Sequence, residues 1–319
     1  MSATKRIGLF VAGLAVVFVA AVAAGSLFDP AETESNESHG GEQVATAEHE
    51  GTEEKMDTHT AEAAHGGQEA RHEPAGLSIS EGGYTLRLVS TRFVQGEAGR
   101  LRFSIEGADG EPVTDFDELH ERRMHLIVVR RDGVRFQHLH PEMDATGTWT
   151  VPLQLDRSGV YRAFADFSAG GEQHTLAGDL FVFGGKFEAE PFPPPQPLDA
   201  TDGYEVRLRA GDLVAGEPST LTFSVSQGGH AVHGLDPYLG AKGHLVALRE
   251  GDLAFLHVHP EEAGGEHGHD GETAHGHEAG ADEIAFAATF PTAGRYRLYL
   301  QFKHEGIVRT AEFTVEVPR

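Results

Sequence analysis

The chain contains no cysteine among its 319 residues, and this absence excludes several classes of protein. Disulfides, thiolate zinc fingers, iron–sulfur clusters, cysteine nucleophiles and lipidated cysteine anchors are all ruled out. Basic side chains are scarce as well, because 25 lysines and arginines stand against 50 acidic side chains, a formal net charge of −25. A surface of that sign repels nucleic acid, so no nucleic-acid partner is expected.

Histidine, in contrast, is abundant, with 20 copies. Glycine, at 40 residues, exceeds the average share of roughly 7% and favours turns over long helices. No ordinary fold requires so many imidazoles, so the histidine positions are the main guide to function.

The N-terminal region predicts export. Lys5 and Arg6 precede an uncharged apolar run over residues 7–28, which as a helix of about 33 Å is long enough to cross a bilayer. The basic flank predicts a single-pass membrane protein whose C-terminal region lies outside the cytoplasm. The alternative is a secreted protein, because Ala21-Val22-Ala23 resembles a signal-peptide cleavage site.

Composition divides the rest of the chain into a tether, two similar β-rich stretches and a connector. The tether has 13 acidic side chains, five histidines and few large apolar residues, so it is expected to be disordered. The predicted divisions are the tether 29–76, a first sandwich 77–184, a Pro-rich linker 185–199 and a second sandwich 200–318 with a His/acid-rich insertion 262–283.

The two β-rich stretches are copies of each other. Residues 83–88 match residues 203–208, and residues 138–142 match residues 257–261. The offset between the copies grows near their ends, which locates the insertion in the second copy. The chain is therefore a tandem duplication.

Each copy has about 100 residues and roughly seven short strands, which is typical of an immunoglobulin-like sandwich. Tyr161 and Tyr296 each follow a glycine at the start of a late strand, as in a tyrosine corner. The predicted fold is all-β, a tandem pair of immunoglobulin-like β-sandwiches after an N-terminal transmembrane helix and a disordered acidic tether.

Three histidines of the first copy fall on a predicted hairpin of strands 125–130 and 134–140. Alternation places His125, His138 and His140 on one face with apolar neighbours, so this face is interpreted as the core face. Arg130, Arg135 and Gln137 are expected on the opposite, solvated faces. Three imidazoles at strand spacing can bind one cation with bonds of about 2.0–2.1 Å.

The second copy repeats the pattern with His244, His257 and His259. Pro141 and Pro260 follow the two His-x-His pairs, so each trio is expected at the rim of its sandwich. The sequence predicts one three-histidine metal site per sandwich. The alternative is that these histidines are half-exposed polar residues at strand ends.

Further candidate ligands lie outside the trios. Asp117 and Asp236 recur upstream of the histidine strands and could bind the metal, orient an imidazole, or simply start a turn. The insertion could collect metal loosely or be a tolerated acidic loop, and its histidines are His267, His269, His275 and His277. Five histidines have no counterpart in the other copy and are interpreted as ordinary surface residues: His120, His174, His230, His233 and His304.

Imidazole suits zinc, copper and nickel, and Cu(II) binds most tightly in the divalent series. Copper or zinc is expected, with copper slightly favoured, although no single residue decides between them. Met124 and Met143 adjoin the first site, but the second copy has Gly243 and Glu262 there. A dedicated Cu(I) carrier is therefore disfavoured.

The segment from Leu235 to Pro260 carries a family resemblance. Its Gly-His-Leu-Val-Ala-Leu-Arg and Phe-Leu-His-Val-His-Pro stretches resemble a group of exported two-repeat proteins, common in actinobacteria and described as hypothetical or heavy-metal-binding. The chain is also loosely similar to the Ig-like YtkA-type and CopC-type copper proteins in sandwich architecture and histidine ligands. The resemblance implies an extracytoplasmic location and an Ig-like fold.

The hypothesis that follows is a membrane-tethered, extracytoplasmic protein that binds copper or zinc for sequestration or delivery. The membrane would be contacted through residues 7–28, and a protein partner in the envelope is unidentified. The alternative is a structural or interaction module of the cell envelope without a metal. No enzyme activity is expected, because the chain has no nucleophile elbow, phosphate-binding loop or His-Glu-x-x-His.

Overall fold

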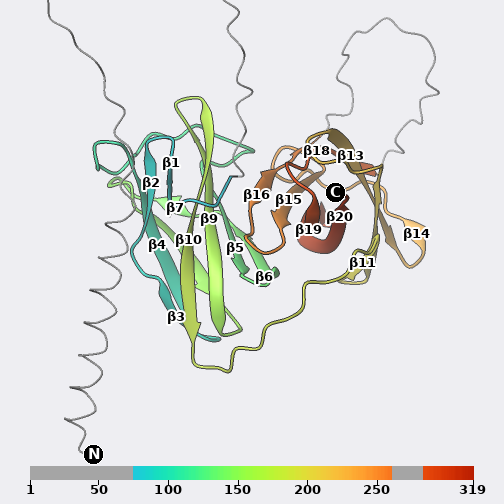
Figure 1. Cartoon of the computed structure of the whole chain (residues 1–319), viewed down its shortest axis with the longest axis horizontal. Coiled ribbons are helices and arrows are strands. Elements are labelled where there is room, and N and C mark those ends of the chain that lie inside the picture. Colours follow the sequence, from blue (N-terminus) through green and yellow to red (C-terminus); the bar gives the residue numbers. More distant parts are fainter. Residues whose placement is uncertain (1–74, 261–282) are drawn as a thin grey trace, which may run out of the picture. The chain divides into compact units, whose positions relative to one another are not determined.

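The computed structural model describes residues 75–260 and 283–319, which form two β-sandwiches (Figure 1). The predicted all-β, tandem immunoglobulin-like architecture is confirmed. The predicted transmembrane segment 7–28, nearly all of the tether 29–76 and all but the last residue of the insertion 262–283 lie outside the described residues. Within the described ranges, no helix is long and apolar enough to cross a membrane.

The first sandwich pairs one sheet of order β1-β2-β4-β8-β7 with one of order β3-β10-β9-β5-β6. Along its strands, inward apolar residues alternate with outward polar ones; in β4, Leu101 and Phe103 are fully buried while Arg100 and Arg102 are exposed. The strands are β1 (Ser80–Glu81), β2 (Tyr84–Leu88), β3 (Arg92–Val94), β4 (Ala98–Glu106), β5 (His125–Arg130), β6 (Val134–Leu139), β7 (Glu142–Met143), β8 (Trp149–Gln154), β9 (Gly159–Ala169) and β10 (Glu172–Phe183).

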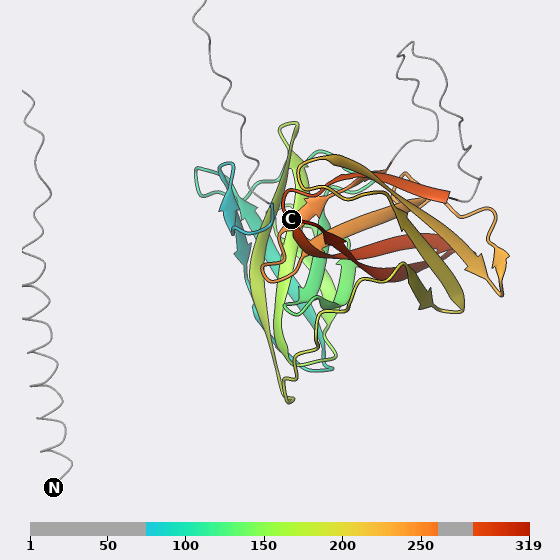
Figure 2. The same cartoon turned by 45° about the vertical axis from the view of Figure 1, so that its right-hand side comes forward.

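The second sandwich repeats this plan, with one sheet of order β11-β12-β13-β18-β17, joined by β14 at β13, and one of order β16-β15-β19-β20. Figure 2 shows its long strands side by side in a second view. The strands are β11 (Leu198–Thr201), β12 (Tyr204–Ala210), β13 (Pro218–Gln227), β14 (His230–Ala231), β15 (Gly243–Arg249), β16 (Phe255–His257), β17 (His259–Pro260), β18 (Glu283–Thr289), β19 (Gly294–His304) and β20 (Ile307–Val317).

Both predicted tyrosine corners are present. The hydroxyl of buried Tyr161 donates to the carbonyl oxygen of Arg157 at 3.0 Å, and that of Tyr296 donates to the carbonyl oxygen of Thr292 at 2.8 Å. Each bond ties the loop before the strand to the strand itself. The two repeats therefore share side-chain hydrogen bonds as well as topology.

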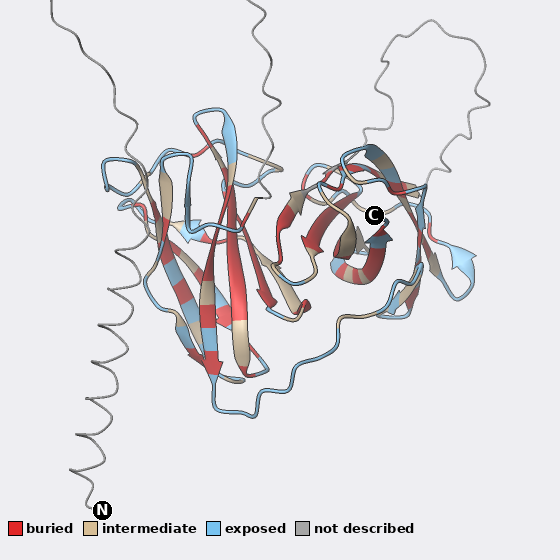
Figure 3. Cartoon of the chain, viewed as in Figure 1, coloured by how far each residue is buried: buried red, intermediate tan, exposed pale blue. Residues whose placement is uncertain are grey.

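The histidine-bearing face of β5 is buried, but it does not face the core of its own sandwich. Leu126 and Val128, which lie on the opposite face of the strand from His125, belong to that core. Ile127 and Val129 belong to a separate apolar cluster that also contains residues of β15, β16 and β19. β5 is thus buried on both faces, as Figure 3 shows by its unbroken red colour.

The burial of β5 also corrects the expectation that Arg130 is solvated. Its side chain is buried, and it forms an ion pair with Asp132 at 2.8 Å and one with linker residue Glu190 at 3.0 Å. Burial of an arginine requires such partners, because an unpaired buried charge is very costly. These ion pairs hold the Pro-rich linker against the end of the β5–β6 hairpin.

The two sandwiches dock through equivalent faces. Phe136 stacks on Tyr299 with ring centroids 4.2 Å apart, while Phe255 packs on Phe164 at 5.5 Å. Phe136 and Phe255 are equivalent residues of the two repeats, as are Phe164 and Tyr299, so each contact is the counterpart of the other. This is the arrangement of an isologous dimer interface, here formed within one chain.

The backbone leading into the first sandwich also bonds to both repeats. Phe255 donates its N–H to the carbonyl oxygen of Ala75 at 2.9 Å, and Gly76 donates to the carbonyl oxygen of Thr175 at 3.1 Å. A side chain at Gly76, where φ is +70°, would lie 2.8 Å from Phe164 and 2.9 Å from Phe255. Glycine is required here because the chain passes through the seam between the repeats.

Replacement of Tyr299 by phenylalanine tests the strength of this docking. The Tyr299 hydroxyl donates to the carbonyl oxygen of Gly133 across the seam at 2.8 Å, and the bond is buried. Tyr299→Phe leaves that acceptor without its donor, so we expect the free energy of unfolding to fall by about 1–2 kcal/mol in urea titrations. The control is Tyr84→Phe, whose hydroxyl makes no hydrogen bond to a described residue; equal stability of the two variants would contradict the account.

Candidate metal centre

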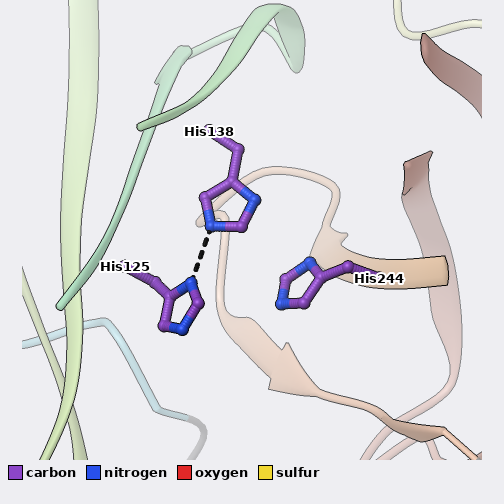
Figure 4. A group of neighbouring side chains, drawn as sticks. All are labelled: His125, His138 and His244. Carbon is purple, nitrogen blue, oxygen red and sulfur yellow. Dashed lines mark hydrogen bonds between the residues drawn. The ribbon is translucent and has the colours of Figure 1, made fainter. Parts of the chain in front are cut away.

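Three histidines meet where the two sandwiches dock (Figure 4). His125 begins β5, His138 lies on β6 opposite Ile127, and His244 is the second residue of β15. One ring nitrogen from each lies within 4.8 Å of the others. Each strand contributes its imidazole on the face that also carries the apolar docking residues, so the docking itself brings the three rings together.

Two of these rings are oriented by carbonyl oxygens, which accept hydrogen bonds from the ring nitrogens that face away from the cluster. His125 donates from Nε2 to the main-chain oxygen of Leu119 at 2.8 Å, because a carbonyl can only accept. His138 donates from Nδ1 to Oε1 of Gln301 at 2.6 Å, while the Gln301 amide nitrogen faces Thr310 Oγ1. Bonds of this kind fix the tautomer and orientation of metal-binding histidines.

With the outer nitrogens protonated, the inner nitrogens face each other. His125 Nδ1 and His138 Nε2 are 3.0 Å apart, and in the neutral rings each carries a lone pair. Such an approach is favourable only with a proton or a cation between the two atoms. Burial and the charges of His125 and His140 lower the pKa of His138 well below its ordinary value, which disfavours the charged imidazolium.

His140 completes the predicted first trio. Its ring centroid is 5.2 Å from that of His125 and 4.8 Å from that of His138. Its Nε2 atom is buried and has no hydrogen-bond partner among the described residues. Burial, with the charges of His125 and Arg122, lowers its pKa to about 4. His140 is therefore a neutral imidazole at the edge of the cluster.

The structure places His244 with the first trio. The His244 ring is stacked on His125 at 5.6 Å and lies 4.6 Å from His138. Its predicted companions, His257 and His259, have side chains outside the described part. Their backbones belong to different sheets, because His257 pairs with Val246 and His259 pairs with Ala287.

Asp117 and Asp236 lie at turns in both repeats. Asp117 Oδ2 accepts from the N–H of Gly171 at 2.8 Å, and Asp236 Oδ2 accepts from the N–H of Gly306 at 2.8 Å. Each carboxylate caps the hairpin between the two longest strands of its sandwich. This geometry is that of a residue that stabilises a turn. Among the described residues, the group that could hold a metal consists of His125, His138 and His244 and includes neither aspartate.

The other candidate residues are spread over the molecule. Met124 is buried in the core of the first sandwich, and Met143 packs against that core. His174 contacts Tyr84, and His304 hydrogen-bonds the Tyr204 hydroxyl at 2.9 Å. Four predicted metal-collecting residues lie outside the described residues: His267, His269, His275 and His277.

Two residues near the cluster carried no sequence signal. His120, which we expected to be an ordinary surface residue, has its ring 6.1 Å from that of His125. Asp166 is buried on β9 opposite His125 and accepts a hydrogen bond from Thr175 Oγ1 at 2.9 Å. Burial raises the Asp166 pKa. The second repeat has Gln301 at the position of Asp166, opposite His244, so comparing the repeats could not reveal this carboxylate.

The fold, the duplication and the shared corners define a class, the two-repeat immunoglobulin-like sandwich proteins. Both repeats match one family, described as a domain of unknown function (DUF8832), over residues 79–182 and 199–319. The chain therefore belongs to this family. No curated protein matches the chain. These comparisons do not support the looser likeness to the YtkA-type and CopC-type copper proteins.

Several solved structures resemble the chain at low identity. An Escherichia coli alpha-2-macroglobulin activated by porcine elastase is 15% identical over 74% of this chain and 20% of that chain, with a TM-score of 0.24. The Yersinia pseudotuberculosis adhesin InvE is 11% identical over 74% of this chain and 60% of that chain, with a TM-score of 0.22. The Escherichia coli adhesin FdeC is 16% identical over 77% of this chain and 65% of that chain, with a TM-score of 0.21. The chain spans less than two thirds of each of them.

The lowered pKa values of His138 and His140 predict acid sensitivity of the metal-free protein. Below about pH 6.5, the unfolded chain binds protons at these two groups more readily than the folded chain does, and the folded-state pKa of His140 is about 4. Their contribution to stability is therefore complete above about pH 6.5 and is lost as the pH falls toward 4. We expect the urea midpoint, measured with chelator present, to fall over this range.

His140→Asn removes the contribution of His140 to this pH dependence. The raised pKa of Asp166 acts on stability in the opposite direction, but Asp166 is present in both proteins, so the comparison isolates His140. The variant is expected to lose less stability between pH 6.5 and pH 4 than the wild type. Equal pH dependence of the two proteins would contradict the neutral state of His140.

Proposed function

We propose that the protein is a membrane-tethered, extracytoplasmic metal-binding protein that holds copper or zinc for sequestration or delivery. The observation that carries the proposal is the pair of inner nitrogens on His125 and His138, facing each other at 3.0 Å with a His244 ring nitrogen within 4.8 Å. Tetrahedral bonds of about 2.0–2.1 Å put ligand nitrogens about 3.3 Å apart. A small adjustment of the rings would therefore let one ion bind all three.

The site would hold one ion per chain. The His244 ring lies beside those of His125 and His138. The proposed centre is therefore shared by the two sandwiches, whereas the sequence predicts one centre in each sandwich. His140 supplies a fourth imidazole next to His125 and His138. A nitrogen-only ligand set suits Cu(II) and Zn(II) better than Cu(I), which prefers sulfur ligands.

The segments outside the described residues have supporting roles in this proposal. Residues 7–28 would anchor the chain in the cytoplasmic membrane, as their charge and length predict. The histidines of the tether and of the insertion would collect ions loosely and raise their concentration near the centre. A partner in the envelope would receive or supply the metal.

The first test is metal stoichiometry. We expect the wild-type exported region to retain about one Cu(II) or Zn(II) after dialysis against a weak chelator. His138→Ala and His244→Ala should each lower the retained metal by about tenfold or more, because each removes a ligand. His174→Ala is the matched control, since His174 packs against Tyr84 and Phe167 away from the cluster.

Two results would contradict the proposal: a wild type that retains no metal, or equal retention by His138→Ala and the His174→Ala control. The first result would favour the second candidate function, a structural module of the envelope. The observation that favours this candidate is the aromatic packing of the two repeats, such as Phe136 on Tyr299, which needs no metal.

A second test asks whether the docked arrangement creates the site. Leu248 packs in the cluster between the sandwiches, whereas the core of its own sandwich is built from residues of the other parity such as Leu245 and Ala247. Leu248→Asp should weaken docking and lower metal affinity by about tenfold or more without unfolding the second sandwich. Ile307→Asp, at a position 56% exposed, is the control. Unchanged affinity in a Leu248→Asp protein shown to be undocked by small-angle scattering would contradict the shared centre.

A further inference from the structure

His120 lies at the edge of the metal centre and contacts histidines of both repeats. Its ring centroid is 6.1 Å from that of His125 and 6.0 Å from that of His244, with the rings nearly perpendicular in both pairs. The side chain is half-buried, while the next residues, Glu121 and Arg122, are exposed. His120 therefore lies between the buried imidazoles and solvent.

A tight turn holds His120 in this place. Leu119 donates its N–H to the carbonyl oxygen of Arg122 at 2.7 Å, and Arg122 donates back to Leu119 at 3.1 Å. Both central residues are left-handed, with φ of 48° at His120 and 62° at Glu121. Turns of this type favour glycine or asparagine, so two other residues in succession cost conformational energy.

The second repeat shows what the relaxed turn contains. Tyr238 and Ala241 exchange the same pair of backbone hydrogen bonds, at 2.8 and 3.3 Å. The central residues there are Leu239, with φ of 57°, and Gly240, with φ of 80°. The first repeat therefore keeps the turn but places an imidazole where the second has leucine, and it keeps a strained residue where the second has glycine.

The turn is also tied to a ligand of the proposed centre. The Leu119 carbonyl oxygen accepts the Nε2 proton of His125 at 2.8 Å, and Leu119 directly precedes His120. The position of the turn and the orientation of His125 are thus fixed by the same hydrogen bond. A small movement of the His120 side chain would bring its ring to the same distance from His125 that His140 already has.

We propose that His120 is an additional ligand of the metal centre, and that it binds a divalent copper or zinc ion from the solvent side of the cluster. This inference rests on the proposed function. The strained turn holds the imidazole close to the centre before the ion arrives, which reduces the conformational entropy lost on binding. His120 thereby joins ligands of the first and second repeats.

The test compares Cu(II) binding by wild type, His120→Leu and Glu121→Gly. His120→Leu introduces the residue of the second repeat, so the turn is kept and only the imidazole is lost. We expect Cu(II) affinity, measured by competition with a chelator, to fall by about tenfold. Pulsed electron paramagnetic resonance should count one fewer coordinated imidazole. His120→Asn, which suits a left-handed turn, repeats the test should the leucine variant fold poorly.

Glu121→Gly is the matched control, because it relaxes the turn and keeps the imidazole. It should raise the melting temperature of the metal-free protein by about 2–4 °C and keep all coordinated imidazoles. His120 variants with wild-type affinity and an unchanged imidazole count would overturn the inference while the proposed function stands. A wild type that binds no Cu(II) would instead overturn the proposed function.

Discussion

The docking of two equivalent sheet faces determines which residues of β5 and β15 are buried and where the histidines lie. β5 and β15 carry apolar residues at both parities, so each strand must bury two faces. One face lies in the core of its own sandwich, and the other finds cover only on the equivalent face of the other repeat. The linker and residues 75–77 are fastened to the same region by the buried side chains of Arg130 and Arg162.

This constraint explains how polar imidazoles come to be buried. His125 is the first residue of β5 and His244 the second residue of β15, the two strands whose outer faces dock. Each therefore lies at the seam and not in a sandwich core. Burial of a polar ring requires a partner, and His125 and His138 find carbonyl oxygens for their outer nitrogens. The inner nitrogens then converge, which is the chemical basis of the proposed centre.

Much of the fold could be predicted from the sequence. The duplication, the β5–β6 hairpin and the two tyrosine corners all follow from local patterns, because strand alternation and turn residues act over short distances. The partner of the histidine face could not be predicted. Periodicity shows that a face is buried, but it does not show what covers it. The unbroken run His-Leu-Ile-Val-Val-Arg is apolar at positions on both faces of the strand, which is a sequence signal of two-sided burial.

The candidate site was predictable to a similar extent. His125, His138 and His140 converge because they lie on the same face of the hairpin, as strand alternation predicts. His244 joins them only because the two sandwiches dock, which brings together residues more than 100 positions apart in the sequence. His120 and Asp166 were missed because the second repeat has Leu239 and Gln301 in their places. Comparison of the repeats detects shared residues, and a centre built across a seam need not be symmetric.

Anomalous X-ray scattering from crystals of residues 75–319 grown with Cu(II) would locate the metal directly. The account predicts one dominant copper peak per chain, about 2 Å from His125 Nδ1, His138 Nε2 and a ring nitrogen of His244. A separate peak within each sandwich, or a seam without copper while the metal is bound elsewhere, would contradict it.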